Sequence, residues 1–360
     1  MRILTVVGAR PQFIKSAAVS RVLRATPGVV EILVHTGQHY DKSMSQVFFD
    51  QMDIALPDYN LQIGSGKHGW QTGRMVEAIE TVILQEMPDW VLVYGDTNST
   101  LAGALAAVKL CIRVAHVEAG LRSYNRKMPE EINRVLTDHA SDLLLAPTIR
   151  AVKNLDREGL PEDRVRMTGD VMLDASMYYG AKAEAQSRIL EHTGLVPGQY
   201  LLGTIHRAEN TDDVDRLAAI FEGFAMASRN MDIVIPLHPR TQAALARHES
   251  LTGTLASLRV IQPVGYLDML MLEKNARIIA TDSGGVQKEA FFYGVPCVTL
   301  REETEWVETV ESGWNRVIPP TDPVVIADAL GRAAEMRGEP GTPYGTGHAA
   351  EAVVESLMGH

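Results

Sequence analysis

Short apolar runs alternate with longer amphipathic or alanine-rich stretches along the first half of the chain. Six runs have the length and the β-branched content of buried strands: Arg2–Gly8, Val30–Thr36, Trp90–Gly95, Arg113–Val117, Leu143–Ala146 and Val165–Thr168. Between them lie stretches of helical character, at Phe13–Ala25, Thr72–Gln85, Ser99–Leu110 and Glu130–Ser141. Alternation of strand and helix predicts a parallel, doubly wound sheet with helices on both faces.

A second series of the same kind follows a long predicted helix, Leu173 to Glu191, and the polar break Leu195–Gln199. Its predicted strands are Tyr200–Ile205, Ile233–Leu237, Arg259–Ile261, Arg277–Thr281 and Cys297–Leu300. A chain of 360 residues exceeds what one hydrophobic core usually serves, which agrees with two such halves. We therefore predict an α/β protein with two Rossmann-like, doubly wound parallel-sheet domains. We expect an N-terminal domain over residues 1–172, a C-terminal domain over 173–340, and a C-terminal segment over 341–360 whose helix packs back on the N-terminal domain.

Composition excludes several classes of protein. Apolar residues make up 46% and charged residues 22%, values typical of a soluble globular chain. The 45 acidic and 34 basic residues give a net charge of −11, which argues against nucleic-acid binding. No apolar run is long enough to span a membrane, and Arg10 and Pro11 interrupt the N-terminal run before a signal peptide develops. We expect a cytoplasmic protein that binds neither nucleic acid nor membrane.

The two cysteines, Cys111 and Cys297, lie far apart and form no Cys-x-x-Cys pair. Each is expected to be a small residue of the core. We therefore predict neither a metal site nor a disulfide.

Two carboxylates follow consecutive predicted strands. Asp96 comes just after Trp90–Gly95, and Glu118 directly follows Arg113–Val117, with one helix between the two strands. A strand–helix–strand unit of this size makes a right-handed crossover between parallel strands. If the strands are neighbours, they lie about 4.8 Å apart and both acids lie at the carboxyl edge, where open α/β sheets bind ligands. Alternatively Asp96 only caps the next helix. That alternative does not apply to Glu118, which precedes Ala119 and Gly120.

Two further acids, Glu130 and Glu131, follow Pro129 at the start of a predicted helix. Proline and acids in a first turn favour a helix whatever its function. A short loop joins this helix to Glu118, and it would bring Glu130 back to the same edge of the sheet.

The second half contains a predicted phosphate site. Residues 283–285 form a serine–glycine–glycine turn between a strand and a helix, where free backbone N–H groups and the helix dipole favour an anion. Glu289 lies one turn inside that helix, placed to accept hydrogen bonds from ribose hydroxyls. His206 and His238 each follow a predicted strand, and with the turn they would surround a diphosphate. Neither a Walker A sequence nor Gly-x-Gly-x-x-Gly stands at a strand–helix junction, which argues against ATP hydrolysis and a standard dinucleotide site.

Other charged side chains have weaker signals. Arg10 follows the first strand and would add a guanidinium to an anion site. Lys15 and Arg74 are expected to be solvated helix charges unless a ligand reaches them. The remaining histidines for which the pattern gives no chemical setting are His39, His68, His116, His139 and His192.

Eight motifs together resemble those of the non-hydrolysing UDP-N-acetylglucosamine 2-epimerase family, in the family's order and over nearly the whole chain. They are Gly8–Pro11, Gly95–Thr100, His116–Arg122, Pro129–Arg134, His206–Asn210, Pro236–Arg240, Thr281–Ala290 and Pro343–Gly345. The resemblance implies a GT-B architecture, with a UDP-sugar in a central cleft between the two domains, and a homodimer.

The resemblance also implies roles for individual residues. The catalytic residues would be Asp96, Glu118, Glu130 and His206, the last at the leaving diphosphate. The UDP-sugar would be bound by Arg10, Lys15, His238, Arg240, Ser283, Gly284, Gly285, Glu289 and Arg301. Candidates for an allosteric or second site are Gln38, His39, Arg74 and Glu131.

The chemistry of such an enzyme explains these residue types. Inverting C2 requires removal of a proton that is not acidic in the bound sugar, and loss of UDP from C1 acidifies it by building oxocarbenium character. Cationic groups and a helix N-terminus would stabilise the departing UDP, while carboxylates remove the proton and return it to the other face. The intermediate would be a 2-acetamidoglucal. The route needs no nicotinamide, metal or other cofactor.

Two departures from the family pattern bear on the substrate. Ala208 replaces the second arginine of His-Arg-Arg-Glu, and Trp306 and Val307 replace the Arg-Pro of Thr-Glu-Arg-Pro-Glu. Both resemble the branch that acts on UDP-2,3-diacetamido-2,3-dideoxyglucuronate, and the lost arginine argues against activation by a second UDP-sugar. A GT-B glycosyltransferase remains the alternative enzyme class, and a catalytically silent UDP-sugar sensor a third.

Overall fold

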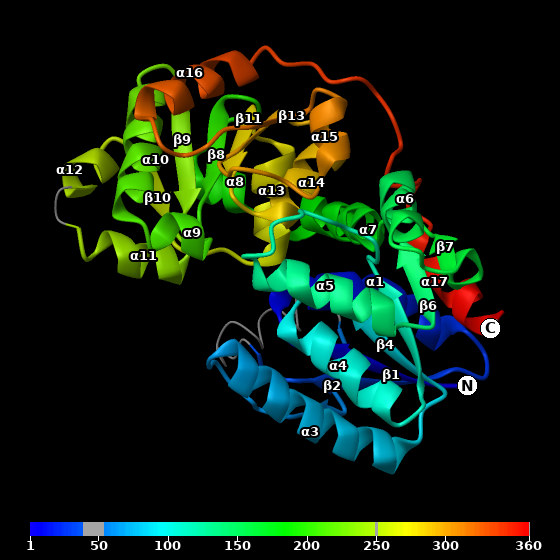
Figure 1. The fold of residues 1–360 in the computed structure, drawn as a ribbon. Coiled ribbons are helices and arrows are strands. Elements are labelled where there is room, and N and C mark those ends of the chain that lie inside the picture. Colours follow the sequence, from blue (N-terminus) through cyan, green and yellow to red (C-terminus); the bar gives the residue numbers. More distant parts are fainter. Residues whose placement is uncertain (39–53, 249–250, 360) are drawn as a thin grey trace. The chain divides into compact units, whose positions relative to one another are not determined.

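The chain forms two compact units, each built around one parallel sheet (Figure 1). The computed structural model describes residues 1–38, 54–248 and 251–359. The first unit contains residues 1–177 and 342–360, and the second contains residues 178–341. The prediction of two doubly wound parallel sheets is confirmed.

The sheet of the first unit has the strand order β3-β2-β1-β4-β5-β6-β7. Its strands are β1 (Arg2–Val7), β2 (Val30–His35), β3 (Tyr59–Asn60), β4 (Trp90–Tyr94), β5 (Arg113–Val117), β6 (Leu143–Ala146) and β7 (Val165–Met167). Its helices are α1 (Arg10–Ala25), α3 (His68–Glu86), α4 (Asn98–Lys109), α5 (Pro129–Ala140), α6 (Ile149–Arg157) and α17 (Ala349–Met358), with a 3-10 turn at Glu162–Arg164. Strands β4 and β5 are parallel, as the sequence predicted, and they are hydrogen-bonded neighbours, which meets the condition for placing Asp96 and Glu118 close together.

The sheet of the second unit has the order β10-β9-β8-β11-β12-β13. Its strands are β8 (Tyr200–Thr204), β9 (Asp232–Pro236), β10 (Arg259–Ile261), β11 (Ile278–Thr281), β12 (Cys297–Thr299) and β13 (Asn315–Val317). Its helices are α8 (Ile189–Thr193), α9 (Ala208–Thr211), α10 (Val214–Ala227), α11 (Pro239–Leu245), α12 (Thr252–Leu255), α13 (Tyr266–Lys274), α14 (Gly284–Phe292), α15 (Val307–Glu311) and α16 (Pro323–Ala333).

The single long helix predicted over Leu173–Glu191 is wrong. Helix α7 (Val171–Gln186) ends earlier, and α8 begins after Ser187 and Arg188. The Ser187 hydroxyl donates to the Asp268 carboxylate at 2.6 Å and accepts from the Ile189 N–H at 3.2 Å. Ser187, which precedes the N-cap Arg188, thus binds the first N–H of α8 with its side chain at the break between the two helices.

Helix α4 packs closely on strands β1 and β4, and this contact sets where its N-terminus lies. A Cβ atom on Gly103 would lie 2.9 Å from Val93 and 3.3 Å from Val6, so only glycine permits this approach. The N-cap of α4 is Thr97, whose side chain accepts from the Thr100 N–H. The alternative that Asp96 merely caps this helix is therefore wrong.

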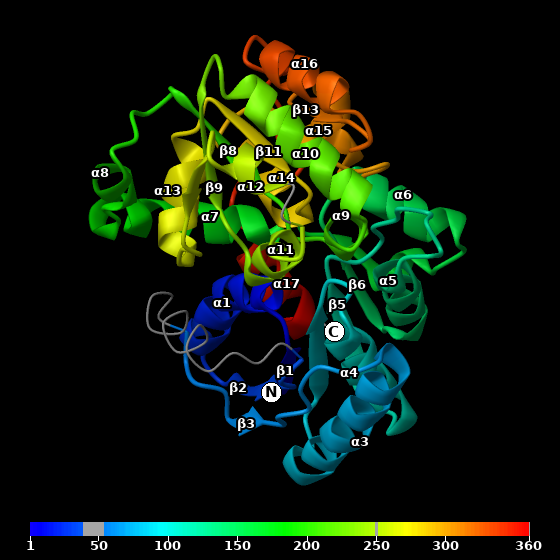
Figure 2. The same cartoon turned by 90° about the vertical axis from the view of Figure 1, so that its left-hand side faces the viewer.

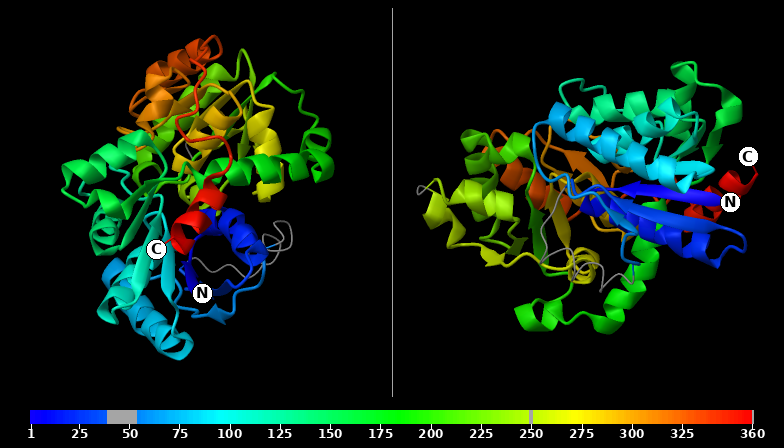
Figure 3. Two further views of the ribbon diagram at one scale, coloured as in Figure 1. Left: turned by 90° about the vertical axis from the view of Figure 1, so that its right-hand side faces the viewer. Right: turned by 90° about the horizontal axis from the view of Figure 1, so that it is seen from below.

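The C-terminal segment belongs to the first unit, where α17 packs beside α1 (Figures 2 and 3). The Asp174 carboxylate accepts hydrogen bonds from the Ala349 and Ala350 N–H groups at 3.2 and 2.7 Å, and so caps α17. Burial raises the pKa of Asp174, an effect that these two backbone bonds partly offset. The Asp170 N–H donates to the Tyr344 carbonyl at 2.9 Å, which fastens the returning chain just before the helix.

The prediction of two core cysteines is half wrong. Cys297 is buried on β12, but Cys111 is exposed at the turn between α4 and β5, with a φ of 57°. The turn reverses the chain within a few residues, so its side chain faces solvent. Among the described residues, no helix combines the length and the hydropathy that a membrane span requires.

Candidate active site

Glu118 is held in an ion pair at the carboxyl end of β5. Its backbone is left-handed, with a φ of 72°, and only 7% of the residue is exposed. Lys15 of α1 reaches both carboxylate oxygens, with its Nζ 2.7 Å from Oε1 and 2.6 Å from Oε2. The expectation that Lys15 is a solvated helix charge is therefore wrong, because α1 turns this side chain toward the sheet edge. Gly95 leaves room for the pair, since a Cβ there would lie 3.2 Å from the Lys15 Nζ.

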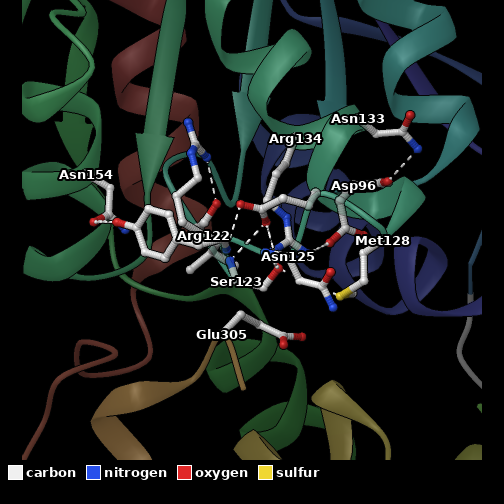
Figure 4. Close-up of polar contacts among 12 residues, drawn as sticks. Asp96, Arg122, Ser123, Asn125, Met128, Asn133, Arg134, Asn154 and Glu305 are labelled. Carbon is white, nitrogen blue, oxygen red and sulfur yellow. Dashed lines mark hydrogen bonds and ion pairs between the residues drawn. The ribbon is translucent and has the colours of Figure 1, made fainter. Parts of the chain in front are cut away.

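Asp96 is oriented by a buried guanidinium from α5. The Arg134 side chain, 2% exposed, donates from Nη2 to the Asp96 carboxylate and from Nη1 to Glu131 at 2.9 Å. Figure 4 shows Arg134 and Asn133 reaching Asp96 from the same helix. The Asn133 amide donates to the Asp96 backbone carbonyl at 2.9 Å. The two predicted acids thus follow neighbouring strands, and each is paired with one cation from a helix, Asp96 with Arg134 of α5 and Glu118 with Lys15 of α1.

The two glutamates at the start of α5 have different surroundings. Glu131 is buried and accepts from the Ser123 N–H, the Ser123 hydroxyl and the Tyr124 N–H, at 2.9 to 3.0 Å. It therefore holds the loop before α5, in which Tyr124 has a φ of 59°. Glu130 is half-buried. Within the described part of the chain, its carboxylate has no hydrogen-bond or ion-pair partner, so of the two acids it is the one available to a ligand.

A network of charged side chains, most of them buried, begins at His116 of β5, two residues before Glu118. His116 of β5 is fully buried, with Nδ1 2.7 Å from Asp138 and Nε2 2.7 Å from the Gly95 carbonyl. Asp138 also pairs with Arg122 at 2.7 Å, and Arg122 pairs with Glu158. Burial raises the pKa of Asp138, but the bonds from His116 and the charge of Arg122 outweigh it, and the net pKa is lowered. Sequence reasoning gave His116 no role, although a histidine inside an apolar strand was a usable signal.

Gln12, a second residue that sequence reasoning missed, ties the end of β1 to the end of β4. Its Oε1 accepts from the Gly8 N–H at 2.8 Å, and its Nε2 donates to the Tyr94 carbonyl at 2.9 Å. The side chain is 1% exposed. Gln12 therefore fixes the turn that carries Arg10, which is itself exposed at the start of α1.

The residues predicted for a second site have separate settings. Gln38 is buried and accepts from the Ser99 N–H and hydroxyl at 3.1 and 2.7 Å. Arg74 is a solvated helix charge as expected, 57% exposed and 2.9 Å from Glu77. Glu131 holds the loop described above, and His39 lies outside the described residues.

In the second unit, a buried aspartate organises the loop after β8. The Asp282 carboxylate, 0% exposed, accepts from the His206 N–H at 3.1 Å and the Arg207 N–H at 3.0 Å. The His206 ring remains 40% exposed and lies 5.4 Å from the ring of His238, the N-cap of α11. Both histidines therefore stand side by side at the carboxyl ends of β8 and β9, as the pattern predicted.

The N-terminus of α14 has the features of an anion site. Its N-cap, Ser283, makes no side-chain capping bond to the first turn. A Cβ on Gly285 would meet nothing closer than the Ser283 hydroxyl at 3.9 Å, whereas one on Gly284 would lie 2.7 Å from the Glu305 carboxylate. Space is thus open at the Cβ position of Gly285, in the first turn of α14.

The other predicted ligand-binding residues of this unit differ in exposure. Glu289 is 4% exposed and accepts from the Tyr266 hydroxyl at 2.8 Å. Arg301 is 2% exposed and pairs with Glu305 at 2.9 Å. Arg240 is exposed and pairs with Asp212 at 2.7 Å.

Two units, each built around a doubly wound parallel sheet, define the protein as one of the GT-B class. The sequence profile of the family described as UDP-N-acetylglucosamine 2-epimerase matches residues 21–358. The chain belongs to this family, as its motifs indicated, and the members of that family are isomerases.

Three similar proteins illustrate the range of the family. A UDP-N-acetylglucosamine 2-epimerase homolog of Methanococcus maripaludis is 53% identical over 88% of each chain. The UDP-2,3-diacetamido-2,3-dideoxy-D-glucuronate 2-epimerase of Pseudomonas aeruginosa is 47% identical over 99% of each chain. The crystal structure of the Methanocaldococcus jannaschii UDP-GlcNAc 2-epimerase, in complex with UDP-GlcNAc and UDP, superposes with a TM-score of 0.93 at 44% identity, covering all of both chains.

Proposed function

We propose that the protein is a non-hydrolysing 2-epimerase that interconverts UDP-N-acetylglucosamine and UDP-N-acetylmannosamine. The observation that supports this most strongly is a set of three acids: Asp96 and Glu118 at the carboxyl ends of β4 and β5, and Glu130 in the first turn of α5, the helix whose Arg134 binds Asp96. Two of them, Glu118 and Asp96, are paired with the cations of Lys15 and Arg134, and the third, Glu130, has no cation partner within the described chain. A glycosyltransferase has little use for three such carboxylates.

The proposal assigns movement of the C2 proton to the first unit. Elimination of UDP breaks the C1–O bond and the C2–H bond, forms the C1–C2 double bond of a 2-acetamidoglucal, and transfers the C2 proton to a carboxylate. Re-addition of UDP reverses these changes with the proton delivered to the opposite face. Lys15 and Arg134 keep Glu118 and Asp96 in fixed orientations throughout, which spares the reaction the cost of reorganising charge.

The proposal assigns UDP to the second unit. The open space at Gly285 and the helix dipole of α14 suit a phosphate, and His206 and His238 supply hydrogen-bond donors for a departing diphosphate. Exposed Arg240 is a further cation for the same anion. Glu289, already bonded to Tyr266, is preoriented to accept from ribose hydroxyls.

The second candidate substrate is UDP-2,3-diacetamido-2,3-dideoxyglucuronate. The relatives that are named for the two sugars are similarly close, at 47% for the diacetamido enzyme and 45% for a UDP-N-acetylglucosamine enzyme. Trp306, part of the second departure from the family motifs, is 3% exposed. The Lys288 Nζ lies 3.9 Å from the centroid of its ring. The departure thus contacts α14, the helix to which we assign UDP.

Steady-state kinetics on both sugars test this proposal. We expect a new 2-epimer of UDP-N-acetylglucosamine by NMR without any added acceptor, and a kcat/KM at least tenfold above that for the diacetamido uronate. The reverse ratio would assign the protein to the other branch. Release of UDP only when an acceptor is added would instead indicate a glycosyltransferase.

A glycine substitution tests the UDP site. Gly285→Ala is expected to lower UDP affinity at least tenfold, about 1.4 kcal/mol, because the new methyl group would occupy the open space to which we assign a phosphate. Thermal stability should hardly change, since outside its chain neighbours and the backbone of its own helix the nearest atom to that methyl position is the Ser283 hydroxyl at 3.9 Å. The matched control is Gly331→Ala in α16, where the methyl also meets nothing, and calorimetric titration with UDP should distinguish the two.

We further propose that the protein acts in the cytoplasm as a homodimer through the face formed by α3, α4 and α5, three helices that lie in a row in Figure 1. Each of these helices carries a large exposed apolar side chain: Leu84, 57% exposed, Val108, 39%, and Leu136, 49%. Leu136→Glu is expected to convert the dimer to a monomer in light scattering. Val324→Glu, at a 60% exposed position of α16, is the control and should leave the mass unchanged. A wild-type monomer would contradict the proposal.

A further inference from the structure

The ring of His116 has an acceptor at each nitrogen. Nε2 lies 2.7 Å from the carbonyl oxygen of Gly95, and Nδ1 lies 2.7 Å from Oδ1 of Asp138. A carbonyl oxygen has no proton to donate, so Nε2 must carry the hydrogen of the first bond. At Nδ1, a hydrogen must also lie between the ring and the carboxylate.

The surroundings of Asp138 decide where that second hydrogen resides. The other carboxylate oxygen, Oδ2, faces the Arg122 Nη1 at 2.7 Å and the Gly120 N–H at 3.1 Å. Two donors at one oxygen stabilise the ionised carboxylate, which leaves the proton on the imidazole. His116 is therefore an imidazolium at a fully buried position.

The charges of this cluster balance. Arg122 and His116 contribute two positive charges, and Asp138 and Glu158 two negative ones, with Glu158 bound to Arg122 at 2.6 to 2.7 Å. The adjacent strands offer only apolar partners to His116 in the sheet register, Val93 of β4 and Leu144 of β6. A compensated, fully bonded cluster of this kind is tolerated in a core, whereas removal of one member leaves an uncompensated charge.

The two ends of the cluster meet the two loops that carry the acids. Gly95 has a φ of 62° and directly precedes Asp96, and its carbonyl is bound by His116. Gly120 has a φ of 82° and lies two residues after Glu118, and its N–H is bound by Asp138. A single ion pair therefore fixes both loops relative to one another.

We propose that the buried ion pair of a cationic His116 with Asp138 is a positioning device that sets the geometry of Asp96 against Glu118 for proton transfer. The inference rests on the proposed function for its catalytic consequence, but the charge of the ring is independent of it. Neither residue contacts the substrate. A displacement of about 1 Å in a catalytic group costs on the order of 100-fold in rate, which is the scale of effect such a device controls.

The charge of the ring is tested directly by NMR on uniformly ¹⁵N-labelled protein. The signals of His116 are assigned by their loss in His116→Gln. At pH 8, where an ordinary histidine is neutral, we expect both ring nitrogens to show bound protons and imidazolium chemical shifts. A neutral single tautomer at pH 8 would overturn the inference, even in a protein that epimerises normally. In Asp138→Asn, the ring should lose its second proton at the same pH.

Kinetics test the positioning role. His116→Gln and Asp138→Asn should each lower kcat about 100-fold, with KM and UDP affinity within about threefold of wild type. The double variant should be hardly slower than either single variant, because the two residues act as one unit. His192→Gln, at an exposed position of α8, is the matched control. Losses that multiply in the double variant, or that appear in KM instead of kcat, would contradict the proposal. If the wild type does not epimerise its substrate, the proposed function fails. The NMR measurement of the charge on the His116 ring remains a separate test that does not depend on activity.

Discussion

Replacing Glu118 by glutamine is expected to lower turnover by about 10³-fold and to leave UDP affinity within about threefold of wild type. The amide cannot accept or return a proton, while the residues to which we assign UDP lie in the other unit. The same change leaves Lys15 without its counter-charge at a site where the two side chains are 12% and 6% exposed. We therefore also expect a loss of about 3 kcal/mol in the free energy of unfolding.

A double variant separates the two effects of Glu118→Gln. Adding Lys15→Met removes the stranded charge and should recover most of the lost stability, but none of the turnover. Asp96→Asn should likewise reduce turnover strongly and spare UDP binding. UDP affinity that falls in parallel with turnover in Asp96→Asn or Glu118→Gln would count against the catalytic assignments of these acids.

The Arg134→Met variant is expected to lose about 3 kcal/mol in the free energy of unfolding, because Arg134 is a 2% exposed cation shared by two carboxylates. The loop before α5 should be destabilised most. Glu131 would still accept hydrogen bonds from its three donors in this loop, but its negative charge would no longer be neutralised. Activity should fall as well, because Asp96 loses its orienting partner. Urea unfolding and steady-state rates measure the two effects.

Arg332→Met is the matched control for that experiment. Arg332 is 69% exposed and pairs with Asp328 one helical turn away, so its removal should change stability by no more than about 0.5 kcal/mol. Equal effects of the two substitutions would show that the Arg134 pairs contribute no more than a surface ion pair does.

The alternation of apolar runs and helical stretches was enough to predict both sheets, because burial on both faces of a parallel strand leaves a continuous apolar run. The same reasoning placed Asp96, Glu118, His206 and His238 at the carboxyl ends of their strands. The short strands β3, Tyr-Asn, and β13, Asn-Arg-Val, escaped prediction because they are largely polar and form no apolar run.

The hydrophobic pattern of the sequence could not predict which charged side chains pair with one another. Lys15 has the spacing of a solvated helix charge, and only the packing of α1 brings its Nζ to Glu118. His116 and Asp138 lie 22 positions apart in the chain, and the pairing of β5 with the helix that follows it creates their bond. Local sequence indicates which residues are buried and which backbone conformation they favour. Ion pairs of this kind depend instead on how helices and strands pack in the tertiary structure.

We propose that Asp96, Glu118 and Glu130 move one proton across a sugar face. Incubation with UDP-N-acetylglucosamine in deuterium oxide, followed by ¹H NMR, tests it most directly. We expect the C2 proton signal to disappear from the recovered substrate and from the 2-epimer, while the total amount of UDP-sugar stays constant. Glu118→Gln should suppress this exchange. A 2-epimer that retains its original C2 proton, or no exchange with either candidate sugar, would contradict it.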